Sequence, residues 1–137
     1  MMGSYCSAKS AVPQTVKPDV HSTIDKKNKM VYLNIDFPAK YKDNLKYNFD
    51  GPWKLKSTGK INYNGKGNLN LKIDRKKKSM PMFNESKGRF EIPFTASKDL
   101  TSNMTVTYFY CTKEEGGWCR RIVEEGKVGS SFKQKKR

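Results

Sequence analysis

The chain has 137 residues, with 28 Lys or Arg against 13 Asp or Glu, so its formal net charge is +15 and its pI is near 9.8. A domain of this length buries roughly two thirds of its unfolded surface, which suffices for one hydrophobic core and argues against two domains. No apolar run approaches the roughly 20 residues that a membrane span needs, and the N-terminus lacks the apolar centre of a secretory signal. We therefore expect a single soluble domain in the cytoplasm, or a secreted one if the natural N-terminus is longer.

The N-terminal part has the composition of an irregular leader or linker. Residues 1–29 contain scattered Pro, Ser and Lys and show neither a strand period nor a helix period. Regular order is expected to begin at Met30. From Val31 to Phe37 every second residue is apolar, which places four side chains on one face of a strand, and Pro38 then ends it.

The middle of the chain predicts a loop followed by three short strands. Residues 39–52 hold several aromatic side chains among polar ones and end in an Asp-Gly-Pro turn. Alternating apolar residues then predict strands at 53–56, 61–63 and 69–73. The Asn-Gly pair within 64–67 is a strong hairpin signal, so we expect the second and third of these strands to form a hairpin.

The C-terminal half predicts two further strands and a closing hairpin. A basic connector at 74–88 precedes an alternating segment at 90–94, where Pro93 indicates an edge strand or a bulge because proline donates no ladder hydrogen bond. Residues 103–111 are rich in Thr, Val, Tyr and Phe, which favour strands. An acidic, glycine-containing turn leads from them into a returning strand at 118–123.

These elements predict an all-β fold. Six or seven short strands without a convincing helix favour an antiparallel β-sandwich of the immunoglobulin-like class, with a small barrel as the alternative. Residues 95–102 could form one helical turn. The sandwich is expected to span 30–128 and to be followed by a basic tail at 129–137.

Two basic runs stand out against a background rich in lysine and asparagine. That background is what an AT-rich genome encodes on any exposed surface, so the total charge by itself does not indicate a partner. Clustered cations can neutralise phosphates and give salt-dependent binding, but they are equally typical of a solvated loop and a frayed tail. The candidate anion-binding residues in these runs are Arg75, Lys76, Lys77, Lys78, Lys133, Lys135, Lys136 and Arg137.

Cys111 and Cys119 flank the last predicted hairpin and can lie opposite each other near its turn. They form either a pair of thiols or a reversible disulfide. Their spacing is not Cys-x-x-Cys and no βαβ pattern accompanies it, so a redox enzyme is not expected.

The sequence offers no metal, cofactor or catalytic site. A zinc site would have to use Cys6, Cys111, Cys119 and the lone His21, which have no zinc-finger spacing, and Cys6 and His21 fall in the expected leader. There is no phosphate-binding glycine motif and no histidine for a catalytic triad in the expected core. We therefore predict a protein that is not an enzyme and that binds neither metal nor cofactor.

The predicted closing hairpin resembles one known module. The aromatic segment 106–111, the acidic turn, Cys119 and the basic-apolar strand after it resemble the end of the C-terminal β-sandwich domain of thioredoxin-like NHL-propeller proteins, the family of NHL-repeat-containing protein two. Segment 33–38, followed by Tyr41 and Trp53, is similar to that module's opening strand, loop and Trp-bearing segment. The resemblance implies a stand-alone module, or a fragment of a larger protein, without the thioredoxin domain that carries redox activity.

These observations lead to two alternative hypotheses for the function of the protein. The first is a non-catalytic accessory or protein-interaction module, which the resemblance implies. The alternative is a basic protein that binds nucleic acid or another anionic surface through the two basic runs. The preference for lysine over arginine would then indicate diffuse phosphate contact instead of base recognition.

Overall fold

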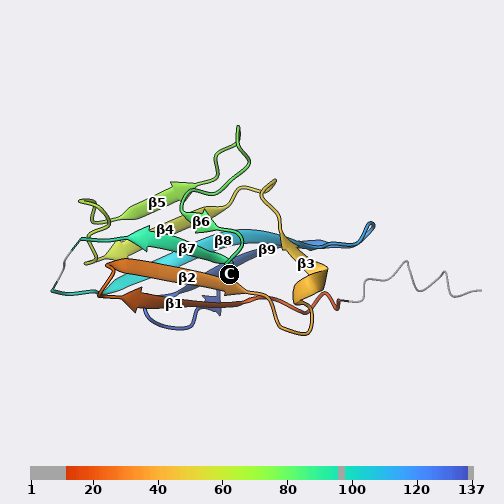
Figure 1. The fold of residues 1–137 in the computed structure, drawn as a ribbon, viewed down its shortest axis with the longest axis horizontal. Helices are drawn as coiled ribbons and strands as arrows, with labels where there is room; N and C mark the ends of the chain where they lie inside the picture. Colours follow the sequence, from red (N-terminus) through yellow and green to blue (C-terminus); the bar gives the residue numbers. More distant parts are fainter. Residues whose placement is uncertain (1–11, 96–97, 136–137) are drawn as a thin grey trace, which may run out of the picture.

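The computed structural model describes residues 12–95 and 98–135, which form two antiparallel sheets and a short 3-10 helix at Lys42–Asn44 (Figure 1). Sheet A has the order β1 (Asp19–Asp25), β2 (Met30–Asp36), β7 (Arg89–Pro93), β6 (Phe83–Asn84). Sheet B has the order β10 (Lys133–Gln134), β9 (Cys119–Lys127), β8 (Ser102–Thr112), β4 (Lys54–Gly59), β5 (Leu69–Lys72), and β3 (Leu45–Tyr47) also pairs with β8. The expected all-β fold with antiparallel pairing is therefore confirmed.

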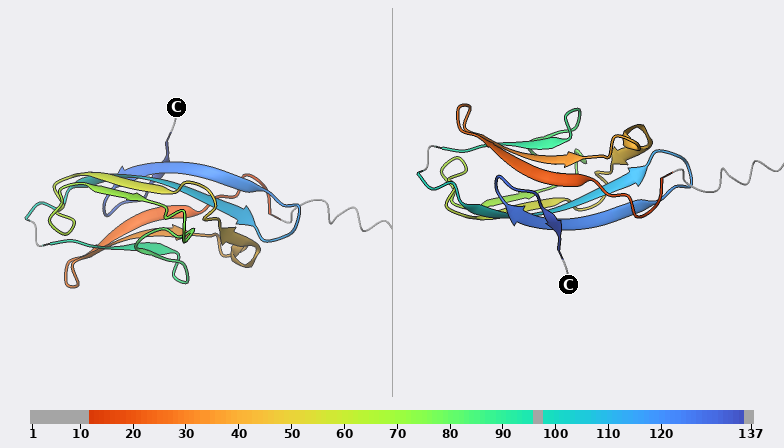
Figure 2. Two further views of the ribbon diagram at one scale, coloured as in Figure 1. Left: turned by 90° about the horizontal axis from the view of Figure 1, so that it is seen from above. Right: turned by 90° about the horizontal axis from the view of Figure 1, so that it is seen from below.

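The two sheets lie face to face, and their inner faces form the core (Figure 2). Strand alternation explains this arrangement, since Val31, Leu33 and Ile35 on β2 all point inward and have no exposed surface. Trp53, just before β4, is also fully buried. Its ring lies 6.2 Å from that of Tyr108, and its Nε1 donates a hydrogen bond of 2.6 Å to the Asn48 carbonyl. The polar part of the indole is thus satisfied inside the core.

The structure places a strand inside the segment that the sequence predicts to be irregular. β1 pairs with β2 along its full length, so the sandwich begins at Asp19 and not at Met30. Val20, Ser22 and Ile24 are the inward positions of β1, and the polar Ser22 hides the apolar alternation. Ser22 is buried at 3% exposure, and the Gly129 amide donates a 2.7 Å hydrogen bond to its hydroxyl.

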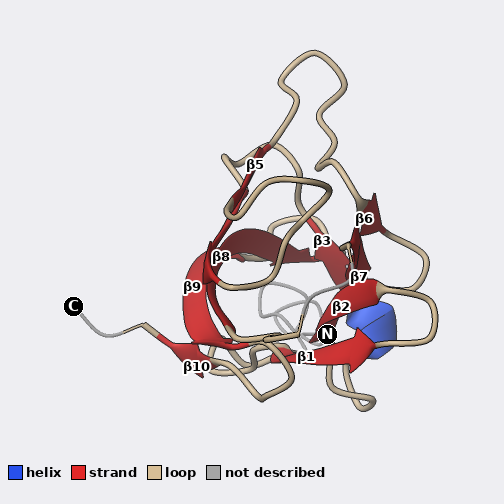
Figure 3. Cartoon of the chain, turned by 90° about the vertical axis from the view of Figure 1, so that its left-hand side faces the viewer, coloured by secondary structure: helices blue, strands red, loops and turns tan. Residues whose placement is uncertain are grey.

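The segment predicted to be a basic tail closes one side of the sandwich. The Phe132 amide donates to the Val20 carbonyl at 2.7 Å, and the Ser22 amide donates to the Ser130 carbonyl at 2.9 Å. The chain then continues into β10, which pairs with β9 (Figure 3). Because this segment contacts β1 and β9 in turn, it joins the edges of the two sheets. The folded unit therefore extends beyond residue 128.

The predicted strand at 61–63 is absent from the structure. β4 pairs directly with β5, with Leu55 opposite Leu71, so residues 61–63 belong to the connection between these two strands. The Asn64-Gly65 turn does form, because both residues have positive φ and the Tyr63 amide donates to the Lys66 carbonyl at 2.8 Å. The prediction of a turn is confirmed, but the turn does not join two strands directly.

Two further expectations concern the closing hairpin and the position of Pro93. β8 and β9 form the predicted hairpin. Pro93, however, belongs to β7, which lies between β2 and β6 and is not an edge strand. The proline is tolerated because it lies at the end of β7, beyond the two residues of β6, so no ladder bond to β6 is lost. The helical turn expected at 95–102 lies partly outside the described residues.

Candidate functional site

The first predicted basic run forms an exposed turn between β5 and β6. The Asp74 carboxylate accepts hydrogen bonds from the Lys76 and Lys77 amides at 3.0 and 3.4 Å, which fixes the backbone of the turn. Lys78 forms an ion pair with Asp50 at 3.4 Å, with both side chains more than 70% exposed. Arg75 and the three lysines after it are exposed. The turn that carries them extends beyond the β5 edge of sheet B (Figure 1).

The second predicted run lies at the opposite edge of the same sheet. Lys133 and Lys135 are exposed on and after β10, which ends sheet B on the side away from β5. Lys136 and Arg137 lie outside the described residues. The structure therefore does not bring the two runs together, and the width of sheet B separates them.

The outer face of sheet B carries exposed cations that do not form a run in the sequence. Alternate side chains of a strand point to opposite faces, so the lysines on either side of the buried Leu55 point outward. The group, which we call the basic face, consists of Lys46 on β3, Lys54 and Lys56 on β4, Lys72 on β5, and Arg121 and Lys127 on β9. Among the described strands of sheet B, Glu125 is the one acidic residue on that face.

Strand register is what assembles the basic face. Lys54 lies directly opposite Lys72, although the two are far apart in the sequence, and Thr107 lies on the other side of Lys54. Alternation within β4 already indicated that its lysines would point outward. Their neighbours could not be inferred without the pairing partners of each strand, and this is why sequence reasoning found only the contiguous runs.

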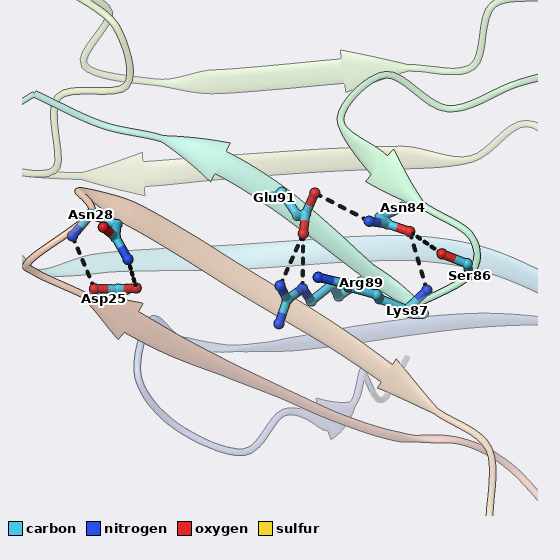
Figure 4. Close-up of polar contacts among 7 residues, drawn as sticks. All are labelled: Asp25, Asn28, Asn84, Ser86, Lys87, Arg89 and Glu91. Carbon is cyan, nitrogen blue, oxygen red and sulfur yellow. Dashed lines mark hydrogen bonds and ion pairs between the residues drawn. The ribbon is translucent and has the colours of Figure 1, made fainter.

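On the outer face of sheet A, Arg89 and Glu91 neutralise each other's charge. Arg89 on β7 forms an ion pair with Glu91 at 3.0 Å, and Asn84 donates to the same carboxylate at 3.4 Å (Figure 4). Desolvation disfavours the charged form of Glu91, but the hydrogen bonds from Arg89 and Asn84 outweigh it and lower its pKa. The Arg89 guanidinium also lies 4.0 Å from the centre of the Tyr32 ring. This face therefore differs from the basic face, whose described cations form no such ion pairs.

Cys111 and Cys119 lie directly opposite each other in the β8–β9 ladder, with their Cα atoms 4.0 Å apart, and the structure joins them by a disulfide. The neighbouring turn is held by the Thr112 hydroxyl, which accepts a 3.1 Å hydrogen bond from the Trp118 amide. The Trp118 indole in turn donates to the Val12 carbonyl at 3.0 Å. The disulfide therefore lies at the base of a turn that packs against the N-terminal segment.

A buried carboxylate lies between the sheets at the closed side. Glu124 on β9 has no exposed surface, and Lys17 donates a 2.6 Å hydrogen bond to its Oε1. Desolvation raises the pKa of Glu124 above its ordinary value, although Lys17 acts in the opposite direction. Glu124 Oε2 and the Tyr108 hydroxyl are buried without a hydrogen-bond partner among the described residues. The strand predicted at 118–123 ends just before Glu124, so the sequence did not indicate that this residue is buried.

A groove of about 450 Å³ lies between the segment after β2 and the β6–β7 turn. Its lining includes Asp36, Lys42, Lys46, Glu85 and Lys87. These are oppositely charged side chains on loops and strand ends. The groove by itself does not define a reaction, and the prediction that the chain is not an enzyme stays a prediction.

The four residues considered for zinc do not form a site together. Cys6 lies outside the described residues, and Cys111 and Cys119 are bonded to each other. His21 lies on β1, not in an irregular leader, and its ring faces two aspartates. The spacing of residues in the sequence did not reveal that the carboxylates of Asp19 and Asp36 lie beside this histidine.

Comparison of the chain with protein families, with curated proteins and with solved structures finds no match. The resemblance to the C-terminal domain of the NHL-repeat-containing protein two family therefore stays a prediction. In the described part of the chain, no helix has the length and apolar character required to cross a bilayer.

Proposed function

We propose that the chain is a non-catalytic binding module that docks on an acidic partner protein through the basic face. The observation that supports this proposal is the contrast between the two outer faces. Arg89 on sheet A is paired with Glu91, whereas none of the cations of the basic face forms an ion pair within the described part of the chain.

The basic face contains a destabilising arrangement that a partner would relieve. Lys54 and Lys72 are like charges in one cross-strand pair, and such a pair weakens a sheet instead of stabilising it. Lys56 extends the cluster along β4, and Arg75 begins the basic turn shortly after Lys72. Carboxylates on a partner surface would replace this repulsion by attraction, which favours association and increases its rate.

The partner class follows from the chemistry and shape of the face. Lysine ammonium groups are compact point charges without the forked geometry of arginine, so they suit dispersed carboxylates better than base edges. Because the cations other than Lys46 lie on the open face of the sheet and not in the groove, the partner must present an extended surface. The proposal includes an immunoglobulin-like topology for the sandwich and a relationship to the NHL-repeat-containing protein two family.

Charge reversal on the basic face tests the proposal. The double variant Lys54→Glu/Lys72→Glu is compared with wild type by fluorescence anisotropy against labelled poly-glutamate at two salt concentrations. An exposed charge pair contributes about 0.2–1 kcal/mol, so the loss of two should weaken binding by roughly tenfold. Added salt should weaken wild-type binding more than binding by the variant.

The matched control is Lys26→Glu/Lys27→Glu, which makes the same charge change in the exposed turn between β1 and β2. If only the net charge matters, both double variants lose affinity equally and the basic face has no special role. If wild type does not bind poly-glutamate even at low salt, the proposed function is wrong.

Nucleic acid is the second candidate, because basic runs lie at both edges of the sheet that carries the basic face. A strand of RNA laid across sheet B could contact Lys72, Lys54 and Lys133 in succession. Anisotropy with single-stranded oligo-uridine of matched charge distinguishes the two partners. Tighter binding of RNA than of poly-glutamate, with a steep dependence on salt, would favour this second function over the first.

A further inference from the structure

We propose that Asp19, His21 and Asp36 form a binding site for a divalent transition-metal ion of the Zn²⁺ class. The site lies on the outer face of sheet A, at the start of β1 and the end of β2. It is separate from the basic face, so this proposal does not depend on the proposed function.

Strand register brings the three residues together. Asp19 and Asp36 are directly opposite each other in the β1–β2 ladder, and His21 lies two positions along β1 on the same face. The backbone of both strands is held by a continuous antiparallel ladder, and His21 also has a bridge partner, Ser131, on the other side of β1. The ligands are thus carried by paired strands and not by a loop.

The distances between the donor atoms fit a single coordination sphere. His21 Nδ1 lies 3.1 Å from an oxygen of Asp19 and 3.8 Å from an oxygen of Asp36. All three donor atoms lie within 4.8 Å of one another. With metal–ligand bonds of about 2.0–2.2 Å, tetrahedral ligands are about 3.4 Å apart, so an ion can reach all three after small side-chain rotations.

The local charge also favours a cation. Asp19 and Asp36 form a like-charge cross-strand pair, which destabilises the sheet unless it is neutralised. In a chain rich in lysine, the ion-pair partner of these two carboxylates among the described residues is the single His21. Protonation of that imidazole adds one positive charge, whereas a divalent ion neutralises both carboxylates.

The negative charges of Asp19 and Asp36 also affect the pKa values of neighbouring groups. Desolvation is the main cause of the raised pKa of Tyr47, and the charge of Asp36 raises it further. Asp19 likewise adds to the raised pKa of Glu124, after desolvation. A bound cation would weaken both effects.

The donor set indicates the class of ion. Imidazole nitrogen suits Zn²⁺, Cu²⁺ and Ni²⁺, whereas carboxylate oxygen alone suits Mg²⁺ and Ca²⁺. One nitrogen and two oxygens therefore select a transition ion over Mg²⁺, and the exposure of both carboxylates leaves room for water as further ligands. By joining the two strands, such an ion would also stabilise the β1–β2 pair.

The test uses the tag-free full chain, because His21 is its only histidine and gives unambiguous imidazole signals in NMR spectra. Titration with Zn²⁺ should shift the Nδ1 resonance of His21 in a saturable way that chelator reverses, and it should raise the melting temperature. Mg²⁺ at the same concentration should do neither. Isothermal titration calorimetry supplies the dissociation constant.

Variants His21→Asn and Asp36→Asn should each weaken Zn²⁺ binding by more than roughly tenfold. Loss of a residue that only hydrogen-bonds to a metal ligand already costs about that much, and these two residues are proposed as ligands themselves. Asp43→Asn, an exposed carboxylate in the 3-10 helix, is the matched control and should bind as wild type does. The proposal is overturned if Zn²⁺ leaves the His21 signals unchanged, or if His21→Asn and Asp36→Asn bind as tightly as wild type. Either result would mean that the three side chains form ion pairs only.

Discussion

Glu124 shows how a single residue can oppose the stability of the fold that contains it. Its carboxylate has lost all contact with solvent, and its one ion-pair partner among the described residues, Lys17, is itself 40% exposed. Burial of a charge costs free energy that a single partner recovers only in part, and Oε2 has no partner in the described part of the chain. Folding therefore shifts Glu124 toward its protonated form.

We expect the Glu124→Gln variant to gain stability relative to wild type as pH rises. A carboxyl whose pKa is raised by folding contributes stability below its unfolded pKa, and that contribution is lost as pH rises through the folded pKa. The amide introduced by the substitution does not titrate, so the difference in unfolding free energy between the two proteins isolates this one group. Urea denaturation of both at pH 4 and pH 7 measures it.

A comparison within each pH is needed because other carboxyls act in the opposite direction. Hydrogen bonds lower the pKa of Asp25 and Asp99, so these residues favour the fold at higher pH. They are unchanged in Glu124→Gln and cancel in the difference. A wild-type advantage that grows from pH 4 to pH 7 would contradict the account of Glu124.

At the scale of elements, the strands that can be recognised from the sequence are those with a clear alternation of apolar and polar residues, or with many strand-favouring residues, within the strand itself. β2 and β8 have one face buried against the core, so alternation and residue type alone reveal them. β1 was missed because Ser22 occupies an inward position. The Ser22 hydroxyl accepts a hydrogen bond from the amide of Gly129, which is 107 residues away, and no local sequence pattern indicates such a contact.

The same distinction applies to the candidate sites. The basic run at 75–78 is contiguous and was found, whereas the pairing of Lys54 with Lys72 depends on register. His21 and Asp36 meet only because β1 and β2 pair from Asp19 onward. Residue types and strand faces can thus be predicted from the sequence, but the clusters that they form across strands cannot.

The β8–β9 hairpin allows a test of its disulfide as an element of stability. Replacing Cys111 and Cys119 by Ser opens a loop whose two ends are 8 residues apart in the sequence. The chain-entropy relation gives a loss of about 2.5 kcal/mol in unfolding free energy for a loop of this length. Chemical denaturation of the variant and of wild type, each with and without reductant, measures that loss.

Reductant serves as the internal control for this prediction. It should lower the stability of wild type toward that of the double-Ser variant and leave the variant itself unchanged. Equal stability of oxidised and reduced wild type would show that the bond between Cys111 and Cys119 contributes nothing to the fold.

The end of β4 provides a second test at this scale. Gly59 has φ of +139°, and a Cβ there would lie 2.5 Å from backbone atoms of Thr101 and Ser102. Gly59→Ala must therefore shift β4 relative to β8, and we expect a loss of about 3 kcal/mol, as for other substitutions that force backbone shifts in a packed interior. Urea denaturation gives the value.

Gly65→Ala is the matched control because Gly65 also has positive φ, at +85°, but a Cβ there meets nothing within 4 Å. Gly65→Ala should lower the unfolding free energy by about 1 kcal/mol, which is the cost of holding a residue other than glycine at positive φ. If the two variants lose the same stability, the contact of β4 with the Thr101 and Ser102 backbone is not what requires glycine at position 59.

For the whole molecule, the segment that was expected to be a tail is what joins the two sheets. It pairs with β1 through Ser130 and Phe132 and with β9 through β10, so the edges of both sheets are covered on that side (Figure 3). On the other side, β5 and β6 end their sheets. An unpaired strand edge can recruit further chains, so by covering part of the β1 and β9 edges this segment reduces the exposed edge on that side.

Phe132→Ala should therefore destabilise the entire domain and not only its C-terminus. The ring is 6% exposed and packs against the core, close to Gly126, where an added Cβ would lie 2.6 Å from it. Removal of a buried phenylalanine ring costs about 3–5 kcal/mol. Because the segment also holds β1, the loss should appear as one cooperative transition with a lower midpoint, and both fluorescence and far-UV circular dichroism should report it.

The control is Lys133→Ala, since Lys133 is the next residue along the chain and is exposed. This variant should change the unfolding free energy by less than about 0.5 kcal/mol. A Phe132→Ala protein that unfolds at the wild-type midpoint would mean that the C-terminal segment only covers the sandwich and does not hold it together.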